Sequence, residues 1–439
     1  MYNRQQHAIT GILFMQNRFK ALVRRIKEHP LAKLGPGLVT GVADDDPSGI
    51  VTYSQAGAQF GFNMLWTMPL TFPLMVGIQT ICARLGRLTG KGLAANIKLH
   101  FPPAVIWLVV ILLVIANTLN IAADVAAMGE VAELVLGFNR HLMAGCFVIL
   151  TLLLQIFIPY HRYVVYLKWL TLSLLSYALI LFVVHIDWAQ AFRNTLFPSF
   201  AWNANSTAMI VGIFGTTISP YLFFWQASEE VEDLHRQGGK SLLEDHSLAK
   251  VELERISWDT WSGMLYSNIS AYFIILATGA TLFVAGVHDI ETAAQAAMAL
   301  KPLAGDFAFE LFAVGMLGVG LIGIPVLAGS AAYALSEMMG WSWGLEKKWG
   351  EAPEFYLTIT LSVGVAIFLQ YLSISPMKAL VWSAVTNGVI AVPLMLVMML
   401  LSANKAVMGE FSLPTHIKIL GWLATGLMML AVIVMFVLF

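Results

Sequence analysis

Charged side chains are scarce in this chain of 439 residues, where Asp, Glu, Lys and Arg together make up 12% of the sequence. Soluble domains are nearer one-quarter charged, and a water-facing surface cannot be built from so few charges. Basic and acidic residues nearly balance, at 25 Lys plus Arg against 26 Asp plus Glu, so there is no basic field for a polyanion. The composition therefore excludes a soluble enzyme, a nucleic-acid-binding protein and a disordered scaffold.

Cysteine is nearly absent as well. Cys82 and Cys146 lie in apolar runs and lack the spacing of a metal site, so we expect them to be small core residues. The N-terminus carries charges and has no small-residue cleavage site, so we expect no secretory signal. Neither a resident cofactor nor an obligate protein partner is indicated.

Apolar sequence is abundant, with 58% hydrophobic residues and a mean hydropathy of +0.75. A helix needs about 20 apolar residues to cross a bilayer, and a helix closes its backbone hydrogen bonds within one segment. Eleven segments meet this requirement: 34–60, 63–86, 102–128, 141–159, 163–186, 205–228, 257–286, 306–338, 353–373, 379–401 and 417–438. We therefore expect an all-α membrane protein with eleven transmembrane helices in a lipid bilayer.

Basic residues are distributed unevenly between the two sides of this arrangement. With the N-terminus inside, 21 of the 25 basic residues are cytoplasmic, and the remaining four are Arg140, Arg193, Lys301 and Lys378. Because Lys and Arg in short loops favour the cytoplasmic side, we expect a cytoplasmic N-terminus and an outward C-terminus. The expected location is the plasma (inner) membrane.

The first and sixth segments are interrupted by polar residues and proline near their middle. The first contains Asp44-Asp45-Asp46-Pro47-Ser48-Gly49, and the sixth contains Thr216-Thr217-Ile218-Ser219-Pro220-Tyr221. Proline removes a backbone donor and clashes with the preceding turn, so Pro47 and Pro220 should break their helices. Paired interruptions in two halves of a chain indicate a transporter binding site.

Spans 1–5 and 6–10 then form two units, each opening on a broken helix. Because each unit has an odd number of spans, the second is inverted relative to the first. The predicted organisation is a basic cytoplasmic N-terminus (1–33), a first five-helix repeat (34–186), a second five-helix repeat (187–401) that contains a cytoplasmic loop (229–256), and a loop with the eleventh helix (402–439).

Three consecutive carboxylates at the bilayer centre need water or a cation beside them, since each costs at least about 2.5 kcal/mol to insert. Asp46, next to the proline, is the expected ligand. Asp45 is either a second ligand or, like Asp44, a cap of the broken helix or part of a wet vestibule. Oxygen atoms also come from unwound carbonyls and from Thr216, Thr217 and Ser219. Oxygen ligands suit hard divalent cations such as Mg²⁺, Ca²⁺ and Mn²⁺.

A set of motifs spans the two broken segments: Gly35-Pro36-Gly37, Ala43 and Asp46-Pro47 in the first, and Pro220 in the sixth. Together they resemble the Nramp family of divalent-metal transporters, and the likeness extends over essentially the whole chain. The resemblance implies the LeuT-type fold, a 5+5 inverted repeat whose helices 1 and 6 are broken mid-membrane. It also implies a transporter rather than an enzyme, with the divalent metal ion as substrate and no cofactor.

The chain departs from the two hallmark motifs of that family, D-P-G-N in helix 1 and M-P-H in helix 6. Gly49 stands in place of a metal-binding Asn, Ser219 in place of the Met, and Tyr221 in place of the His. Thr216 takes the position whose carbonyl binds metal. The Met thioether lets Nramps favour Mn²⁺, Fe²⁺ and Cd²⁺ over Ca²⁺ and Mg²⁺. Its loss resembles the Nramp-related magnesium transporter branch and implies uptake of Mg²⁺, with Mn²⁺ also carried.

Proton coupling should be weak or absent. Classical Nramps carry a T-D-L-A-E-like stretch in helix 3 that forms part of the proton route, whereas here Asp124 is kept and Ala127 replaces the Glu. With Tyr221 in place of the His, two titratable links of a relay are missing. Asp124 is either a proton or gating residue or a buried carboxylate satisfied by helix ends. Asn387, in the tenth segment, either lines the pathway or makes an inter-helix hydrogen bond.

Three alternatives compete with a uniporter-like importer of divalent metal. A proton-coupled Mn²⁺/Fe²⁺ symporter of the classical Nramp type lacks its Met, Asn, His and Glu here. An amino acid symporter of the LeuT fold would bind a substrate carboxylate, which the cluster Asp44–Asp46 would repel. An intramembrane enzyme would need an H-E-x-x-H, G-x-S-x-G or G-x-G-D motif, and no span contains one. The sequence therefore predicts a metal importer that works by alternating access.

Overall fold

The computed structural model describes residues 36–158, 162, 174–199, 201–369 and 375–439. Within these ranges every regular element is a helix, which confirms the all-α expectation for the described part of the chain. The basic segment 1–33 lies outside the described residues, and so do residues 163–173 of the fifth expected span.

Both expected helix breaks are present, each immediately before a proline. The first span consists of α2 (Pro36–Asp44) and α3 (Pro47–Phe60), and the sixth consists of α11 (Ala204–Thr217) and α12 (Pro220–Arg236). Proline is well suited to the first position of a helix, because the N–H it lacks would have no partner there. Pro47 and Pro220 thus end one helix and begin the next.

The remaining long helices are α4 (Thr67–Thr89), α6 (Pro103–Leu136), α7 (Arg140–Phe157), α13 (Ala249–Thr278), α16 (Ala308–Met339), α17 (Pro353–Leu369), α18 (Pro376–Ala403) and α20 (Thr415–Leu438). Short helices connect them: α5 (Leu93–His100), α9 (Leu175–Ile180), α10 (Trp188–Leu196), α14 (Ala293–Ala297), α15 (Lys301–Ala304) and α19 (Lys405–Met408). Within the described residues, eight helical stretches are long and apolar enough to cross a membrane.

Fewer than the eleven predicted spans meet this criterion of length and apolar composition in the described residues, and each shortfall has a physical reason. The two halves of the first span have 9 and 14 residues, so neither spans a bilayer alone. Helix α17 is apolar but has only 17 residues. The fifth expected span lies partly outside the described residues.

Several helices extend further than the apolar pattern predicts. Helix α6 continues past 128 to Leu136 and ends at Gly137, whose φ of 73° terminates it. The expected cytoplasmic loop 229–256 is helical at both ends, because α12 continues to Arg236 and α13 already begins at Ala249. Charged turns persist there because they pair: the Arg255 guanidinium lies 2.5 Å from the Glu230 carboxylate. A hydropathy profile ends a span where charged residues begin, but the helix itself continues through these residues.

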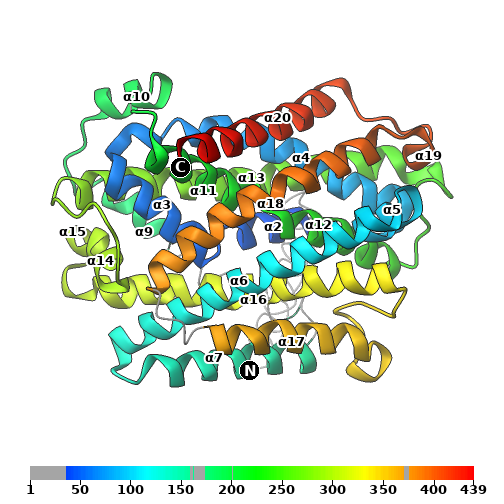
Figure 1. Ribbon diagram of the computed structural model, residues 1–439, viewed down its shortest axis with the longest axis horizontal. Helices are drawn as coiled ribbons and strands as arrows, with labels where there is room; N and C mark the ends of the chain where they lie inside the picture. The colour runs from blue at the N-terminus through cyan, green and yellow to red at the C-terminus, as the bar shows by residue number, and fades with distance from the viewer. Residues whose placement is uncertain (1–35, 159–161, 163–173, 200, 370–374) are drawn as a thin grey trace, which may run out of the picture.

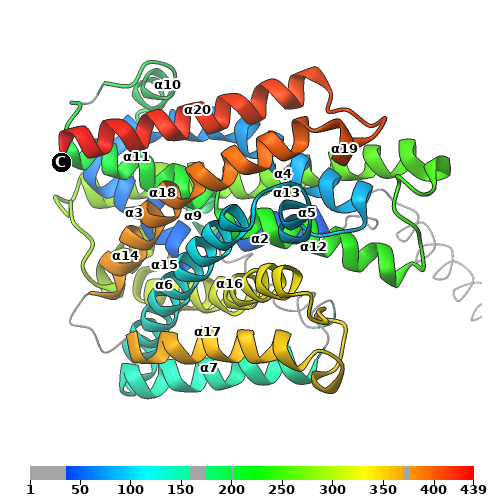
Figure 2. The same ribbon diagram turned by 45° about the vertical axis from the view of Figure 1, so that its right-hand side comes forward.

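The helices form one bundle around the two breaks. Figures 1 and 2 show α7 and α17 side by side along one edge, with α20 along the opposite edge. Only 22% of α7 and 28% of α20 is buried although both are apolar, as expected of helices that face lipid. The half-helix α2 packs directly on α13: a Cβ at Gly41 would lie 2.2 Å from the Gly263 carbonyl oxygen. Small residues permit such close helix contact in membranes.

Candidate metal site

Asp46 lies in the gap between α2 and α3, where it caps the N-terminus of α3. Its Oδ1 accepts hydrogen bonds from the Gly49 backbone N–H at 2.8 Å and from the Ser48 hydroxyl at 2.6 Å. An aspartate at this position satisfies a free helix N–H and is stabilised by the positive end of the helix dipole. The local sequence Asp-Pro-Ser-Gly therefore builds the turn and buries the carboxylate, which is 1% exposed.

The other carboxylate oxygen of Asp46 is held by two distant helices. Asn120 of α6 donates from Nδ2 to Asp46 Oδ2 at 2.8 Å. The Tyr221 hydroxyl of α12 lies 3.4 Å from the same oxygen and 3.0 Å from the Ala43 carbonyl oxygen. Ser383 of α18 in turn donates to Asn120 Oδ1 at 2.6 Å. Asp46 is thereby connected to three helices besides its own, and hydrogen bonds to an ionised carboxylate are among the stronger ones.

Gly49 brings the two helix breaks together. A Cβ at this position would lie 3.2 Å from Thr216 Oγ1 and 3.3 Å from the Asp44 carbonyl oxygen. Because residue 49 has no side chain, a hydroxyl of α11 and a freed carbonyl of α2 both face the turn that carries Asp46. The predicted residues Asp46, Gly49, Thr216 and Tyr221 therefore lie together in the structure.

Thr217 and Ser219 satisfy their hydroxyl groups within the second break. The Ser219 hydroxyl lies 2.7 Å from the Thr216 carbonyl oxygen and 2.8 Å from that of Gly215. Thr217 donates to the Ile213 carbonyl at 2.6 Å, and its Oγ1 lies 3.1 Å from the Tyr53 hydroxyl. Ser219 is thus adjacent to the carbonyl predicted to bind metal, and its hydroxyl has a second acceptor if that carbonyl is engaged.

The other two carboxylates of the run point elsewhere. The Ser267 hydroxyl of α13 lies 2.5 Å from Asp44 Oδ2 and 3.0 Å from Asp45 Oδ1. Asp45, one of whose expected roles was a second ligand, thus contacts α13 through its Oδ1, while its Oδ2 has no hydrogen-bond partner among the described residues. In the described part of the chain, no three His, Cys, Asp or Glu side chains gather as a metal site. Asp46 supplies a carboxylate to the candidate site, and carbonyl, hydroxyl and amide groups surround it.

Asp124 and Asn387 are buried at the edges of this arrangement. Asp124 lies one helical turn beyond Asn120 in α6, and among the described residues neither of its carboxylate oxygens has a hydrogen-bond partner. Asn387 lies in α18, where the neighbouring Gly388 packs against Gly215 just before the second break. Its Nδ2 likewise has no partner within the described ranges.

Asn120 and Ser383 were not predicted from the sequence, although Asn120 contacts Asp46 and Ser383 contacts Asn120. The available signal was an asparagine inside the apolar segment 102–128, because polar side chains are rare within membrane spans and often mark functional sites. Asn117 carries the same signal but serves packing, since it donates to the Leu327 carbonyl and the Ser330 hydroxyl of α16. The amino-acid sequence alone does not distinguish Asn120, which contacts Asp46, from Asn117, which serves packing.

A cavity of about 400 Å³ lies at one end of the bundle, between the ends of α3, α11 and α18. This vestibule is lined by Gln55, Gln59, Asn205, His288, Asp289 and Lys378 among others. Lys378 Nζ lies 2.6 Å from Glu291 Oε1 and 3.4 Å from Asp289 Oδ2. The hydrogen bond and charge of Lys378 hold the pKa of the Glu291 carboxyl below its ordinary value. An ion pair therefore ties the loop after α13 to the start of α18.

Comparison with known proteins covers nearly the whole chain. Residues 37–438 match the family model described as "Natural resistance-associated macrophage protein-like", abbreviated Nramp. The chain is 26% identical over 427 residues to a protein named divalent metal cation transporter MntH from Klebsiella pneumoniae, covering 93% of this chain and 94% of that protein. It is 24% identical over 409 residues to a protein of the same name from Caldanaerobacter subterraneus, covering 91% of each.

Solved structures share the fold. A manganese transporter from Eremococcus coleocola superposes with a TM-score of 0.70 at 19% identity, covering 92% of this chain and 86% of that one. Mhp1, a nucleobase-cation-symport-1 family transporter, superposes with a TM-score of 0.57 at 11% identity, covering 92% of each chain. At these identities the likeness concerns the fold alone, which is LeuT-like.

Proposed function

Since the chain belongs to the Nramp family, we propose that it is a divalent metal cation transporter that imports Mg²⁺, and Mn²⁺ as well. It works by alternating access, in which the two broken helices open the site first to one side of the membrane and then to the other. The metal ion is the substrate. The eleven-span 5+5 inverted repeat predicted from the sequence is part of this proposal.

The observation that carries the proposal is the buried carboxylate of Asp46 between the two helix breaks. The Thr216 hydroxyl and the Asp44 carbonyl oxygen approach Gly49, whose N–H donates to Asp46. The Tyr221 hydroxyl contacts it from α12. A substrate with a carboxylate of its own would be repelled here, whereas a cation would replace the hydrogen-bond donors that now surround Asp46.

The ligand set supports a hard cation. Ser219 and Gly49 provide neither a thioether nor an amide side chain at the positions where the family hallmarks have them. Oxygen ligands favour Mg²⁺, Ca²⁺ and Mn²⁺, whereas sulfur favours softer metals. Mg²⁺ dehydrates reluctantly and usually keeps several waters, so a site with few protein ligands and small side chains suits it.

Weak or absent proton coupling is the second part of the proposal. A proton relay needs titratable groups within reach of one another. Asp124 is buried one turn from Asn120 without a hydrogen-bond partner in the described residues, and Ala127 follows it where the family has a Glu. Tyr221 donates to the Ala43 carbonyl in place of a titratable His. The metal ion then moves down its own electrochemical gradient.

The proposed orientation has the N-terminus in the cytoplasm of a cell bounded by the plasma (inner) membrane. The excess of basic residues on that side supports it. In this orientation the vestibule beside Gln55 and Lys378 opens outward, near the end of α3 that lies away from Asp46. The ion pairs of α12 and α13 then lie on the cytoplasmic side.

The test is metal uptake into proteoliposomes, comparing Mg²⁺, Mn²⁺ and Ca²⁺ while internal pH is recorded. Mg²⁺ uptake without acidification is the expected result. Mn²⁺ uptake with proton influx and without Mg²⁺ uptake would identify a classical proton-coupled symporter, and the selectivity argument from Ser219 and Gly49 would be wrong. Liposomes without protein are the control for leakage.

A further inference from the structure

We propose that Asn120 is a switchable metal ligand: its amide nitrogen, which donates to Asp46 Oδ2, turns away when a metal ion binds, and its amide oxygen then faces the ion. Ser383 is the hydrogen-bond partner that accommodates both orientations. The inference rests on the proposed function of the Asp46 site. Asn120 lies in α6 and Ser383 in α18, and neither belongs to the helix breaks that define the site.

The geometry places an amide donor where a cation would bind. Asn120 Nδ2 lies 2.8 Å from Asp46 Oδ2, and both residues are at most 1% exposed. A cation on Oδ2 would meet the positive end of the amide dipole at short range in a low-dielectric interior, which is strongly unfavourable. A side-chain carbonyl oxygen in the same place is instead a common ligand of Ca²⁺.

Asp46 itself has little room to move away from the amide. A Cβ at Gly323 of α16 would lie 3.1 Å from the Asp46 Cβ, so α16 already packs against this side chain. Its Oδ1 is fixed by the Gly49 backbone N–H at 2.8 Å. The amide group of Asn120 is the movable partner, because the last torsion of an asparagine side chain is broad and roughly two-fold.

Ser383 satisfies the amide before and after it turns. Now the Ser383 hydroxyl donates to Asn120 Oδ1 at 2.6 Å. After a half-turn, Asn120 Nδ2 donates to Ser383 Oγ, and the serine hydroxyl donates to the Leu380 carbonyl oxygen, which already lies 2.8 Å away. A hydroxyl has one donor and two acceptor lone pairs, so every group stays paired in both arrangements.

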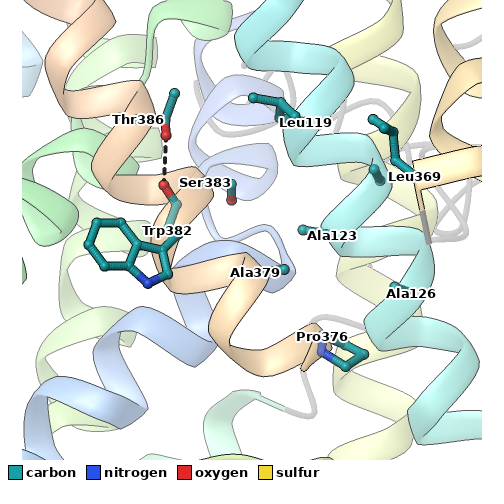
Figure 3. A pocket seen from close by; sticks show the side chains of 10 residues that line it. Leu119, Ala123, Ala126, Leu369, Pro376, Ala379, Trp382, Ser383 and Thr386 are labelled. Atoms are coloured by element: carbon teal, nitrogen blue, oxygen red, sulfur yellow. Dashed lines mark hydrogen bonds between the residues drawn. The ribbon is translucent and has the colours of Figure 1, made fainter. Parts of the chain in front are cut away.

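Among the described residues, the hydrogen-bond partners of the Ser383 hydroxyl are Asn120 and the Leu380 carbonyl of its own helix. Figure 3 shows Ser383 between the ribbons of α18 and α6, at the edge of a cavity of about 220 Å³ whose wall includes Leu119, Ala123 and Ala379. The nearby Thr386 hydroxyl donates to the Trp382 carbonyl of its own helix at 2.9 Å. Ser383 is therefore free to exchange between the amide oxygen and the amide nitrogen of Asn120.

The proposed switch of Asn120 also accounts for the presence of Gly49 where the family motif has an asparagine. The D-P-G-N pattern places an amide on helix 1, and this chain has Gly49 there. Asn120 presents an amide to the same carboxylate from α6, 74 residues away in the sequence. The chain thus keeps an amide in its metal site but supplies it from a helix that is not broken.

The experiment measures Mn²⁺ binding to the purified full-length protein by calorimetry and Mn²⁺ uptake kinetics in proteoliposomes. Asn120→Ala should weaken Mn²⁺ binding by about tenfold or more, as loss of a supporting metal-site group typically does. Asn120→Asp keeps an oxygen ligand and adds charge, so Mn²⁺ affinity should be equal or tighter, while turnover falls because release slows. Ser383→Ala should weaken Mn²⁺ binding less than Asn120→Ala does. Ser383→Thr keeps the hydroxyl group and should bind Mn²⁺ as the wild type does.

Asn117→Ala is the matched control, because it removes a buried asparagine of the same helix that bonds to α16 instead. Its Mn²⁺ affinity should equal that of the wild type. If Asn120→Asp weakens Mn²⁺ binding as Asn120→Ala does, Asn120 only positions Asp46 and the ligand proposal is wrong. Unchanged affinity in a folded Asn120→Ala would also overturn it. Wild-type protein that neither binds nor transports any divalent ion would instead overturn the proposed function.

Discussion

The backbone N–H of Gly37 donates to Asp259 Oδ2 over 2.7 Å, so a carboxylate of α13 caps the first turn of α2. The N–H groups of a first helical turn have no partner within their own helix. Asp259 also lies 3.9 Å from the Arg255 guanidinium, which pairs with Glu230 of α12. One network of polar contacts therefore joins the ends of both broken helices on the proposed cytoplasmic side.

Asp259→Ala should loosen α2 and lower the thermal midpoint of the purified protein. Loss of the acceptor leaves a buried N–H unpaired, which costs about 1–3 kcal/mol. Thermal unfolding in detergent measures the effect. Asp187→Ala is the control, because Asp187 also caps a helix, α10, through the Gln190 N–H at 2.9 Å, but at an exposed position. Equal decreases in the thermal midpoint of the two variants would mean that the cap of α2 contributes no more to stability than the exposed cap of α10.

Gly41→Ala should be strongly destabilising, because the new Cβ would lie 2.2 Å from the Gly263 carbonyl oxygen. Two backbones would have to separate, and overpacking of this kind typically costs about 1–3 kcal/mol or more. Thermal unfolding and the yield of monodisperse protein measure it. Gly364→Ala is the matched control in α17, where nothing lies within 4 Å of an added Cβ. Wild-type stability in Gly41→Ala would contradict the close packing of α2 on α13.

The two helix breaks could be predicted from the sequence because Pro47 and Pro220 each follow a run of polar residues. Both prolines begin a new helix, and Asp46 caps α3. Pro73, Pro325 and Pro393, which lie in apolar sequence, are instead inside helices. Span boundaries were less predictable, because hydropathy does not register that Arg255 and Glu230 neutralise each other and let α12 and α13 continue.

The partners of Asp46 could not be predicted, for a different reason. The contact of Asn120 with Asp46 depends on how α6 rotates about its own axis when it packs, and the apolar residues around this helix give little periodic signal for that rotation. The same limit applies to Asp44 and Asp45, which turn towards Ser267 instead of joining Asp46. Adjacent residues in a broken helix face different neighbours.

The ion pair between Glu291 and Lys378 predicts a pH-dependent contribution to stability. Lys378 holds the pKa of Glu291 below its ordinary value in the folded protein. The stabilisation is therefore present above the unfolded pKa, about 4.3 for Glu, and is lost as pH falls through the lower folded value. Glu291→Gln should lower the thermal midpoint slightly at pH 7, because exposed pairs contribute little.

The difference in thermal midpoint between the wild type and Glu291→Gln should stay constant down to about pH 5. Below that pH the difference should shrink to zero. Thermal unfolding at a series of pH values gives this curve. Glu354→Gln, at an exposed position near the start of α17, is the control for a general effect of removing one charge. A difference that widens as the pH falls would contradict the assigned direction.

Asp46→Asn should abolish metal transport while leaving the protein folded and inserted. The side chain keeps its shape and an acceptor for the Gly49 N–H, but it loses the negative charge that attracts a divalent cation. Mn²⁺ and Mg²⁺ uptake in proteoliposomes measures transport, and size-exclusion chromatography checks the fold. Asp245→Asn is the control, at an exposed cap outside the spans. Retained uptake in Asp46→Asn would remove Asp46 from the site.

Ser219→Met should move ion preference towards Mn²⁺ and Cd²⁺ and away from Mg²⁺. Ser219 is 1% exposed at the second break, and its hydroxyl lies 2.7 Å from the Thr216 carbonyl oxygen. A thioether there adds a soft ligand, and soft ligands favour softer metals. Competition of Cd²⁺ and Mn²⁺ with Mg²⁺ uptake measures the change.

Ser219→Leu separates the chemistry of sulfur from the volume of the side chain. It fills a similar space without a donor atom, so it should impair uptake of all ions without reordering them. If Ser219→Met leaves the ion order unchanged while uptake persists, the second break does not line the metal path. If both variants reorder the ions alike, size rather than the thioether sets selectivity, and the argument that the missing Met favours Mg²⁺ is wrong.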